Sequence, residues 1–202
     1  MVEKQIKSRG VMDPAVLAAM RKIPREKFVL EDLVPEAYND SPLPIEEGQT
    51  ISQPYMVALM TQALELKPGS RVLEVGAGSG YAAAVLGQIA AEVYSIEYFP
   101  KLAELAQSRL QELGYTNVHI KQGDGALGWK EHAPYQGISI TAAATKIPST
   151  LLEQLSIGGK LVMPLALAPF AQELVCITKQ NETEYAYAKL GGVMFVPLLG
   201  KN

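Results

Sequence analysis

The chain has 202 residues, a length that suits one domain, and 48% of them are hydrophobic, which is enough to form a core. The net charge of −3, without any long run of like charges, argues against a nucleic-acid-binding protein. Cys176 is the only cysteine, so the sequence offers neither an internal disulfide nor a Cys/His cluster for a metal.

The sequence shows no targeting or membrane-spanning segment. Its N-terminus lacks the basic-then-apolar order of a signal peptide. The longest apolar stretch, GGKLVMPLALAPFA, is shorter than the roughly 18 residues that span a bilayer, and two prolines interrupt it. We therefore expect a cytoplasmic protein that does not enter a membrane.

The N-terminal part is predicted to form helices followed by a long irregular segment. Residues 1–30 have a helical pattern, in which Asp13 caps a helix that begins at Pro14. Residues 31–53 are rich in proline, and a loop of this length in a small domain is commonly functional. Its apolar side chains argue against disorder.

From residue 54 onward the pattern alternates between helices and strands. Apolar residues at helical spacing predict a helix that begins at Pro54 and ends before the KPG turn at 67–69. The predicted strands that follow span 71–75, 92–97, 118–122, 137–141, 158–164, 173–178, 185–190 and 193–199. The predicted helices among them span 81–90, 100–113 and 148–155.

Repeated strand-then-helix units predict an α/β fold with a mostly parallel, doubly wound sheet. The last strands have no helices between them, so the C-terminal edge of the sheet is predicted to be antiparallel. We expect one domain over residues 1–202. In it, 1–53 forms an N-terminal helical extension and a substrate-side loop, and 54–202 forms the core and the C-terminal strands.

Three glycines stand in the turn after the first of these strands, in the stretch LEVGAGSGY. Gly76, Gly78 and Gly80 permit positive φ angles and let a ligand approach the backbone. In open α/β sheets, ligands bind at this carboxyl end of the strands. A nicotinamide fingerprint would need glycine where Tyr81 stands, and no Gly-Lys-Ser/Thr follows as in a P-loop.

The pattern E-x-G-x-G-x-G resembles motif I of class I S-adenosylmethionine-dependent methyltransferases, whose cofactor carries no phosphate. Glu97 ends the second strand, 19 residues after Gly78, where an acidic side chain can accept both ribose hydroxyl hydrogens. Asp124 follows the third strand, where this family contacts the adenine amino group. The resemblance implies a Rossmann-like fold that binds S-adenosyl-L-methionine and releases S-adenosyl-L-homocysteine. The implied cofactor-binding residues are Glu74, Gly76, Gly78, Ser79, Gly80, Glu97, Asp124 and Gly125.

A narrower resemblance runs in order along nearly the whole chain, from about residue 3 to 199. YNDSPLPIEEGQTISQPYMVALM, VLEVGAGSGYAAAVL, QGDG, TAAATKIP and FVPL resemble the protein-L-isoaspartate O-methyltransferase family. The resemblance implies methylation of the free α-carboxylate of L-isoaspartyl and D-aspartyl residues in damaged proteins, which starts repair through a succinimide. Damaged proteins or peptides would be the partners, and we expect a monomer.

In this family the serine that matches Ser52 is treated as the active-site residue. Its hydroxyl could hold one oxygen of the acceptor carboxylate and aim the other. An ionised carboxylate needs no general base, so neither a catalytic triad nor a metal is required. The resemblance also places Thr50 and Ile51 beside the cofactor. The implied substrate-binding residues are Tyr38, Asp40, Pro42, Leu43, Thr141, Val196, Pro197 and Leu198.

Three of the candidate side chains have simpler explanations that the sequence leaves open. Glu74 could be a solvated charge at a strand end. Asp124 could serve only to form a turn, because Asp-Gly is common in turns. Ser52 could cap the helix that begins at Pro54, since serine is a favoured cap.

Two departures from the family pattern matter, and the second of them concerns the acceptor. Gln136 stands where the family often has an aspartate, which we interpret as structural. PLALAPFAQEL replaces a glycine-containing loop after the fifth strand, and its apolar residues could change substrate choice. Two other functions stay open, namely methylation of an aspartate in one dedicated peptide and cofactor binding without turnover.

Overall fold

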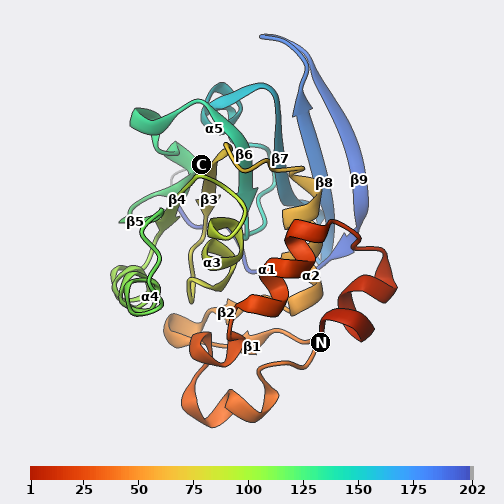
Figure 1. Ribbon diagram of the computed structural model, residues 1–202. Coiled ribbons are helices and arrows are strands. Elements are labelled where there is room, and N and C mark those ends of the chain that lie inside the picture. Colours follow the sequence, from red (N-terminus) through yellow and green to blue (C-terminus); the bar gives the residue numbers. More distant parts are fainter. Residues whose placement is uncertain (201–202) are drawn as a thin grey trace.

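A seven-stranded sheet forms the centre of the computed structural model, which describes residues 1–200 (Figure 1). Its strands are β3 (Arg71–Val75), β4 (Glu92–Glu97), β5 (Val118–Gln122), β6 (Tyr135–Ile140), β7 (Leu155–Ala168), β8 (Ala171–Lys179) and β9 (Tyr185–Val193). They lie in the order β5-β4-β3-β6-β7-β8-β9. All neighbours from β5 to β7 are parallel, whereas β8 is antiparallel to both β7 and β9. The predicted parallel sheet with an antiparallel C-terminal edge is confirmed.

Within residues 1–200, five α-helices accompany the sheet: α1 (Pro14–Lys22), α2 (Pro54–Ala63), α3 (Tyr81–Gly87), α4 (Pro100–Glu112) and α5 (Ser149–Glu153). The predicted cap of α1 is confirmed, because the Asp13 carboxylate accepts hydrogen bonds of 2.8 and 3.2 Å from the N–H groups of Ala15 and Val16. Proline fills the first position of α1, α2 and α4, where its missing N–H has no cost. Over residues 1–200, no helix combines the length and apolar character needed to cross a bilayer.

The segment before α2 is more regular than the sequence predicts. A π-helical turn (Val2–Ile6) and three short 3-10 helices (Lys7–Arg9, Arg25–Phe28 and Glu31–Glu36) surround α1. The proline-rich part then forms a small antiparallel ribbon of β1 (Leu43–Pro44) and β2 (Thr50–Ile51). Leu43 pairs with Ile51, both are buried, and the ribbon is thereby fixed to the core.

The two faces of the sheet pack against different layers, because successive side chains of a strand point to opposite faces. Val72, on one face, belongs to an apolar cluster that includes residues of α1, α2, α3 and α4. Leu73 and Val75, on the other face, belong to a second cluster that includes Leu151 of α5. Figure 1 shows α1, α2 and α3 in front of the sheet, with α4 beside the β5 edge. Helices cover both faces, as predicted.

Three predicted elements differ from the structure. Residues 193–199 were expected to form a strand, but after β9 they form only an isolated bridge, in which Pro197 pairs with Ala143. The predicted helix 148–155 is shorter, since β7 already begins at Leu155. The apolar loop expected at 165–171 is mostly strand, because β7 extends to Ala168 and only Pro169 and Phe170 turn the chain into β8.

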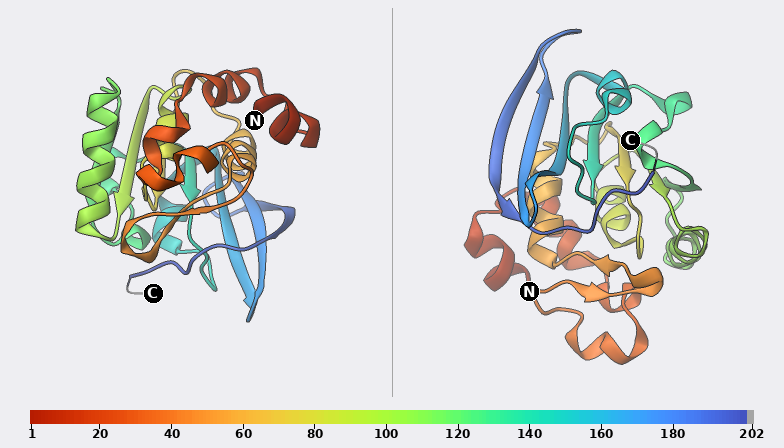
Figure 2. Two further views of the ribbon diagram at one scale, coloured as in Figure 1. Left: turned by 90° about the horizontal axis from the view of Figure 1, so that it is seen from below. Right: turned by 180° about the vertical axis from the view of Figure 1, so that it is seen from behind.

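The terminal segment after β9 crosses the carboxyl ends of the strands (Figure 2). The N–H of Ala143 donates a 2.8 Å hydrogen bond to Val196 O, and the N–H of Leu198 donates another of 2.8 Å to Ala143 O. Gly200 then lies against the carboxylate of Asp124, which follows β5. The C-terminal segment therefore covers the edge of the sheet at which ligands bind in this class of fold.

Candidate functional site

A cavity of about 1050 Å³ opens at the carboxyl ends of β3, β4 and β6. Its wall includes residues of the β2–α2 connection, the glycine turn after β3, the end of β4, the β7–β8 hairpin and the terminal segment. Predicted cofactor-binding residues that line it are Thr50, Ile51, Gly76, Gly78, Ser79 and Glu97. Predicted acceptor-side residues that line it are Pro42, Ser52, Thr141, Val196 and Pro197. The structure thus brings both groups together in one cavity.

The glycine turn depends on backbone angles that other residues disfavour. Gly76 and Gly78 have φ angles of 96° and 53°, in the left-handed region. A Cβ on Gly76 would also overlap the hydroxyl oxygen of Thr141, which stands directly after β6. That hydroxyl lies 2.8 Å from Gly76 O and 3.1 Å from Val75 O, so it donates to the backbone of the turn. Thr141 therefore braces the turn, and its hydroxyl proton is already engaged.

The carboxylate of Glu97 fixes the turn from the neighbouring strand. Gly78 N–H donates to one of its oxygens at 2.8 Å, and Phe99 N–H donates to the other at 3.0 Å. The side chain is only 5% exposed, and it lines the cavity. An ionised carboxylate has about four acceptor positions, so two remain for hydroxyl groups of a ligand.

Ser52 reaches the cavity from the β2–α2 connection. The residue that precedes α2 is Gln53, and no side chain caps this helix. Within residues 1–200 the Ser52 hydroxyl has no hydrogen-bond partner, whereas its carbonyl oxygen accepts a 2.8 Å bond from Nη2 of Arg25. The alternative that Ser52 serves as a helix cap is wrong. Its hydroxyl is available to a ligand in the cavity.

Arg25 is a positioning residue that the sequence did not reveal. Its side chain is 0% exposed, and Nε donates a 2.7 Å hydrogen bond to Ala37 O. The guanidinium carbon lies 4.6 Å from the centre of the Tyr81 ring, at the start of α3. Burial lowers the pKa of Arg25. One buried guanidinium therefore contacts three separate parts of the chain, namely Ala37 before β1, Ser52 before α2 and Tyr81 at the start of α3.

Glu74, a predicted cofactor residue, lies outside the cavity wall, and the alternative of a solvated charge is wrong because the residue is buried. Glu74 is 0% exposed on β3 and does not line the cavity. Ser95 of β4 donates a hydrogen bond to Oε2, whereas Oε1 is buried without a hydrogen-bond partner in the described chain. Burial, opposed by the hydrogen bond from Ser95 and aided by the nearby Glu97 carboxylate, raises the pKa of Glu74 to about 8.

Three other predicted cofactor residues lie outside the cavity wall. Asp124 accepts a 3.0 Å hydrogen bond from Ala126 N–H, so it does shape the turn after β5, and Gly200 covers its carboxylate. Gly125 is buried, and a Cβ there would overlap Val75. Gly80 has a φ of 89° and packs against Ala106 of α4. Gly80 is therefore explained by its positive φ and Gly125 by close packing.

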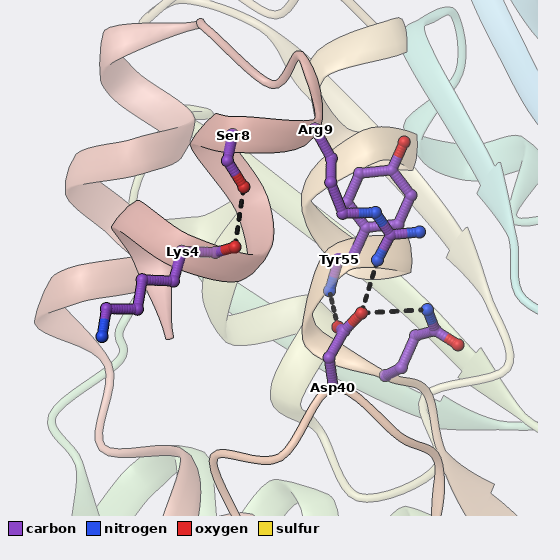
Figure 3. A network of polar contacts seen from close by, with 6 residues as sticks. Lys4, Ser8, Arg9, Asp40 and Tyr55 are labelled. Atoms are coloured by element: carbon purple, nitrogen blue, oxygen red, sulfur yellow. Dashed lines mark hydrogen bonds and ion pairs between the residues drawn. The ribbon is translucent and has the colours of Figure 1, made fainter.

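Asp40, a predicted substrate residue, is engaged in a network at the cavity rim (Figure 3). Its carboxylate receives a 2.5 Å ion pair from Arg9 and hydrogen bonds of 2.9 Å from Tyr55 N–H and 3.4 Å from Gln53. The Arg9 guanidinium also lies 3.4 Å from the centre of the Tyr55 ring. Arg9 and Tyr55 line the cavity, whereas Asp40 does not. Asp40 thus ties the N-terminal segment to the start of α2.

The remaining acceptor-side predictions fall outside the cavity. The Tyr38 hydroxyl donates to Glu26, and its pKa is raised to about 12 by partial burial and this hydrogen bond. Leu43 is 4% exposed in the core. Leu198 packs against the apolar cluster on the α5 face. These residues do not border the cavity, so their contact with an acceptor stays a prediction.

Comparison with known proteins shows which family the chain belongs to. The family model described as protein-L-isoaspartate(D-aspartate) O-methyltransferase matches residues 1–202. The protein-L-isoaspartate O-methyltransferase of Protochlamydia amoebophila is 55% identical over 202 residues, which are 100% of this chain and 96% of that protein. Protein-L-isoaspartate O-methyltransferase 2 of Pelobacter propionicus is 54% identical over 200 residues, covering 99% of this chain and 89% of that protein.

Solved structures give the same result. One protein-L-isoaspartate O-methyltransferase has a TM-score of 0.89 at 32% identity and covers 99% of this chain and 66% of that chain. A putative protein-L-isoaspartate O-methyltransferase from Plasmodium falciparum, in complex with S-adenosyl-L-homocysteine, has a TM-score of 0.80 at 28% identity over 96% of this chain and 94% of that chain. The chain belongs to the protein-L-isoaspartate(D-aspartate) O-methyltransferase family.

Proposed function

We propose that this protein transfers a methyl group from S-adenosyl-L-methionine to the free α-carboxylate of L-isoaspartyl and D-aspartyl residues in damaged proteins. The ester then loses methanol to the neighbouring backbone nitrogen, and hydrolysis of the succinimide returns part of it as normal aspartate. The observation that carries the proposal is the single cavity that joins the glycine turn and Glu97 to the Ser52 hydroxyl. We also propose, from the sequence alone, a cytoplasmic monomer.

The donor end of the cavity suits S-adenosyl-L-methionine. The glycine turn contains no lysine or arginine, and the Glu97 carboxylate beside it would repel a phosphate. The same carboxylate can accept hydrogen bonds from ribose hydroxyls, and the glycine backbone permits close approach. Gly76, Gly78, Ser79 and Glu97 would hold the cofactor. When bound, S-adenosyl-L-methionine supplies an electrophilic methyl group.

The acceptor end requires orientation rather than proton transfer. An α-carboxylate is ionised at neutral pH, so it is already a nucleophile. The Ser52 hydroxyl can donate to one carboxylate oxygen and leave the other to attack. Orientation of this kind can lower a barrier by roughly 7–11 kcal/mol. Because Thr141 already donates to the backbone of the glycine turn, Ser52 is the better candidate for this bond.

Methyl transfer to a matched pair of peptides tests the proposal. The peptides have one sequence and differ only in an isoaspartate or a normal aspartate. With radiolabelled donor, we expect base-labile label on the isoaspartyl peptide alone. Label on the normal peptide would favour the dedicated-aspartate alternative. Donor binding by calorimetry without label on either peptide would favour a binding module.

A further inference from the structure

An uncharged, apolar edge borders the mouth of the cavity. It consists of Leu167 and Phe170 on the β7–β8 hairpin and Met194 after β9, and we refer to these three residues as the apolar rim. Their exposed fractions are 60%, 91% and 67%. Phe170 and Met194 line the same cavity as Ser52. Residues 165–172 and 190–200 carry no charged side chain, so the rim offers apolar surface to whatever occupies the cavity mouth.

The fold itself gives no reason for an aromatic residue at position 170. Pro169 and Phe170 are the two central residues of the turn between β7 and β8, whose last pair is Ala168 with Ala171. Phe170 has a φ of 62°, and positive φ at this position of a turn favours glycine or asparagine. Phe170 therefore exposes a large apolar side chain to solvent, and its backbone adopts a conformation that phenylalanine disfavours. Such a combination is expected where the side chain binds something.

The rim is held in place by Gln172. Its side chain donates a 3.0 Å hydrogen bond to Phe195 O and accepts one of 2.7 Å from Phe195 N–H. These two bonds tie the first residues of β8 to the segment that carries Met194. The β7–β8 hairpin and the terminal segment are therefore fixed relative to each other. Because they are already ordered, little conformational freedom would be lost when they bind a ligand.

A polypeptide bound at Ser52 would reach the rim. If the cavity were round, its volume would correspond to a width on the order of 12 Å, which an extended chain covers in about three or four residues. The rim is thus within reach of side chains that flank the acceptor residue.

We propose that the apolar rim binds a large apolar side chain of the acceptor polypeptide, within about four residues of the isoaspartate. This rests on the proposed function. Hydrophobic side chains are buried in folded proteins, so such a rim selects isoaspartates in segments that are exposed only when a damaged protein has lost its fold. The apolar hairpin would then set the substrate class of this protein.

Isoaspartyl peptides of equal length and charge test this, with phenylalanine or serine placed two, three or four residues to either side. At the best position, we expect the KM of the phenylalanine peptide to be about 10-fold lower than that of the serine peptide. This ratio corresponds to about 1.4 kcal/mol of binding free energy. The variant Phe170→Asn removes the aromatic ring but keeps a residue that tolerates positive φ. In this variant, the KM values of the serine and phenylalanine peptides should differ by no more than about 2-fold. Tyr187→Asn is the matched control, since Tyr187 is 63% exposed but does not line the cavity, and it should keep the ratio.

Equal KM values at every position, with methyl transfer intact, would overturn the rim proposal alone. Absence of transfer to all peptides would overturn the proposed function and this proposal with it. If Phe170→Asn left the ratio of the two KM values unchanged, the rim proposal alone would be overturned. A second copy of the chain is the other molecule that could cover the rim, and light scattering tests for it. If the protein were a dimer that Phe170→Asn dissociated, the rim would be a dimer interface and the proposal would be overturned.

Discussion

The buried guanidinium of Arg25 donates a 2.8 Å hydrogen bond to the carbonyl oxygen of Ser52. A charged group is costly to bury, and here backbone carbonyls and an aromatic ring are its neighbours. This contact fixes the backbone of Ser52 while its hydroxyl stays available. The position of the proposed catalytic hydroxyl therefore depends on a residue 27 positions earlier in the chain.

Replacing Arg25 should impair both stability and turnover. Lysine is a point charge that cannot donate the same two forked hydrogen bonds. We expect Arg25→Lys to lower the free energy of unfolding by about 2–4 kcal/mol and kcat roughly 10-fold. Arg21→Lys, on the exposed side of α1, is the control and should change neither by much. Denaturant titration and kinetics check this, and normal kcat in a destabilised variant would contradict the positioning role.

Ser52→Ala should reduce turnover without destabilising the protein. The hydroxyl has no hydrogen-bond partner within residues 1–200, so its loss should change the free energy of unfolding by less than about 0.5 kcal/mol. Loss of one orienting hydrogen bond should lower kcat roughly 10- to 100-fold, with cofactor affinity unchanged. Ser108→Ala on α4 is the control. A fall in stability with normal kcat would assign Ser52 a structural role.

Glu97→Gln should weaken cofactor binding. Gly78 and Phe99 N–H donate to the two carboxylate oxygens, and an amide can accept from only one side. The ribose hydroxyls would also lose a charged acceptor, so we expect roughly 10- to 100-fold weaker binding of S-adenosyl-L-homocysteine by calorimetry. Glu92→Gln, on the same strand but half-exposed, is the matched control. Equal affinity of the Glu97 variant and the wild type would rule out the ribose contact.

Glu74 should make stability depend on pH. Its pKa of about 8 exceeds the unfolded value of 4.5, so between these values the folded state binds a proton that the unfolded state releases. The free energy of unfolding should therefore fall as pH rises, on the order of 3 kcal/mol from pH 5 to 8. Glu74→Gln should remove this part of the dependence. Parallel stability curves for the two proteins would show that Glu74 is ionised when folded.

The sheet and the donor side of the cavity could be predicted because their signals are local. Strand-then-helix repeats predicted the parallel strands, and Gly76, Gly78 and Glu97 stand at strand ends that the fold brings together. The Asp13 cap was equally readable, since the cap and its two partners are neighbours in sequence.

The rest depends on contacts between distant segments. Nothing near Arg25 in the sequence predicts its burial. Glu74 is also fully buried, which follows neither from the predicted cofactor role nor from the alternative of a solvated charge. The terminal segment has the alternation of a strand, but its backbone hydrogen bonds go to Ala143 and to the side chain of Gln172 rather than to the backbone of a neighbouring strand. Asp124 is covered by Gly200, 76 residues later, which no local pattern indicates.

The central claim is that one cavity holds the donor beside the glycine turn and the acceptor carboxylate beside Ser52. A crystal structure with S-adenosyl-L-homocysteine and an isoaspartyl peptide tests it most directly. We expect the ribose on Glu97 and one α-carboxylate oxygen within hydrogen-bond distance of Ser52 Oγ. A product bound away from the glycine turn, or a peptide whose carboxylate does not reach Ser52, would contradict it.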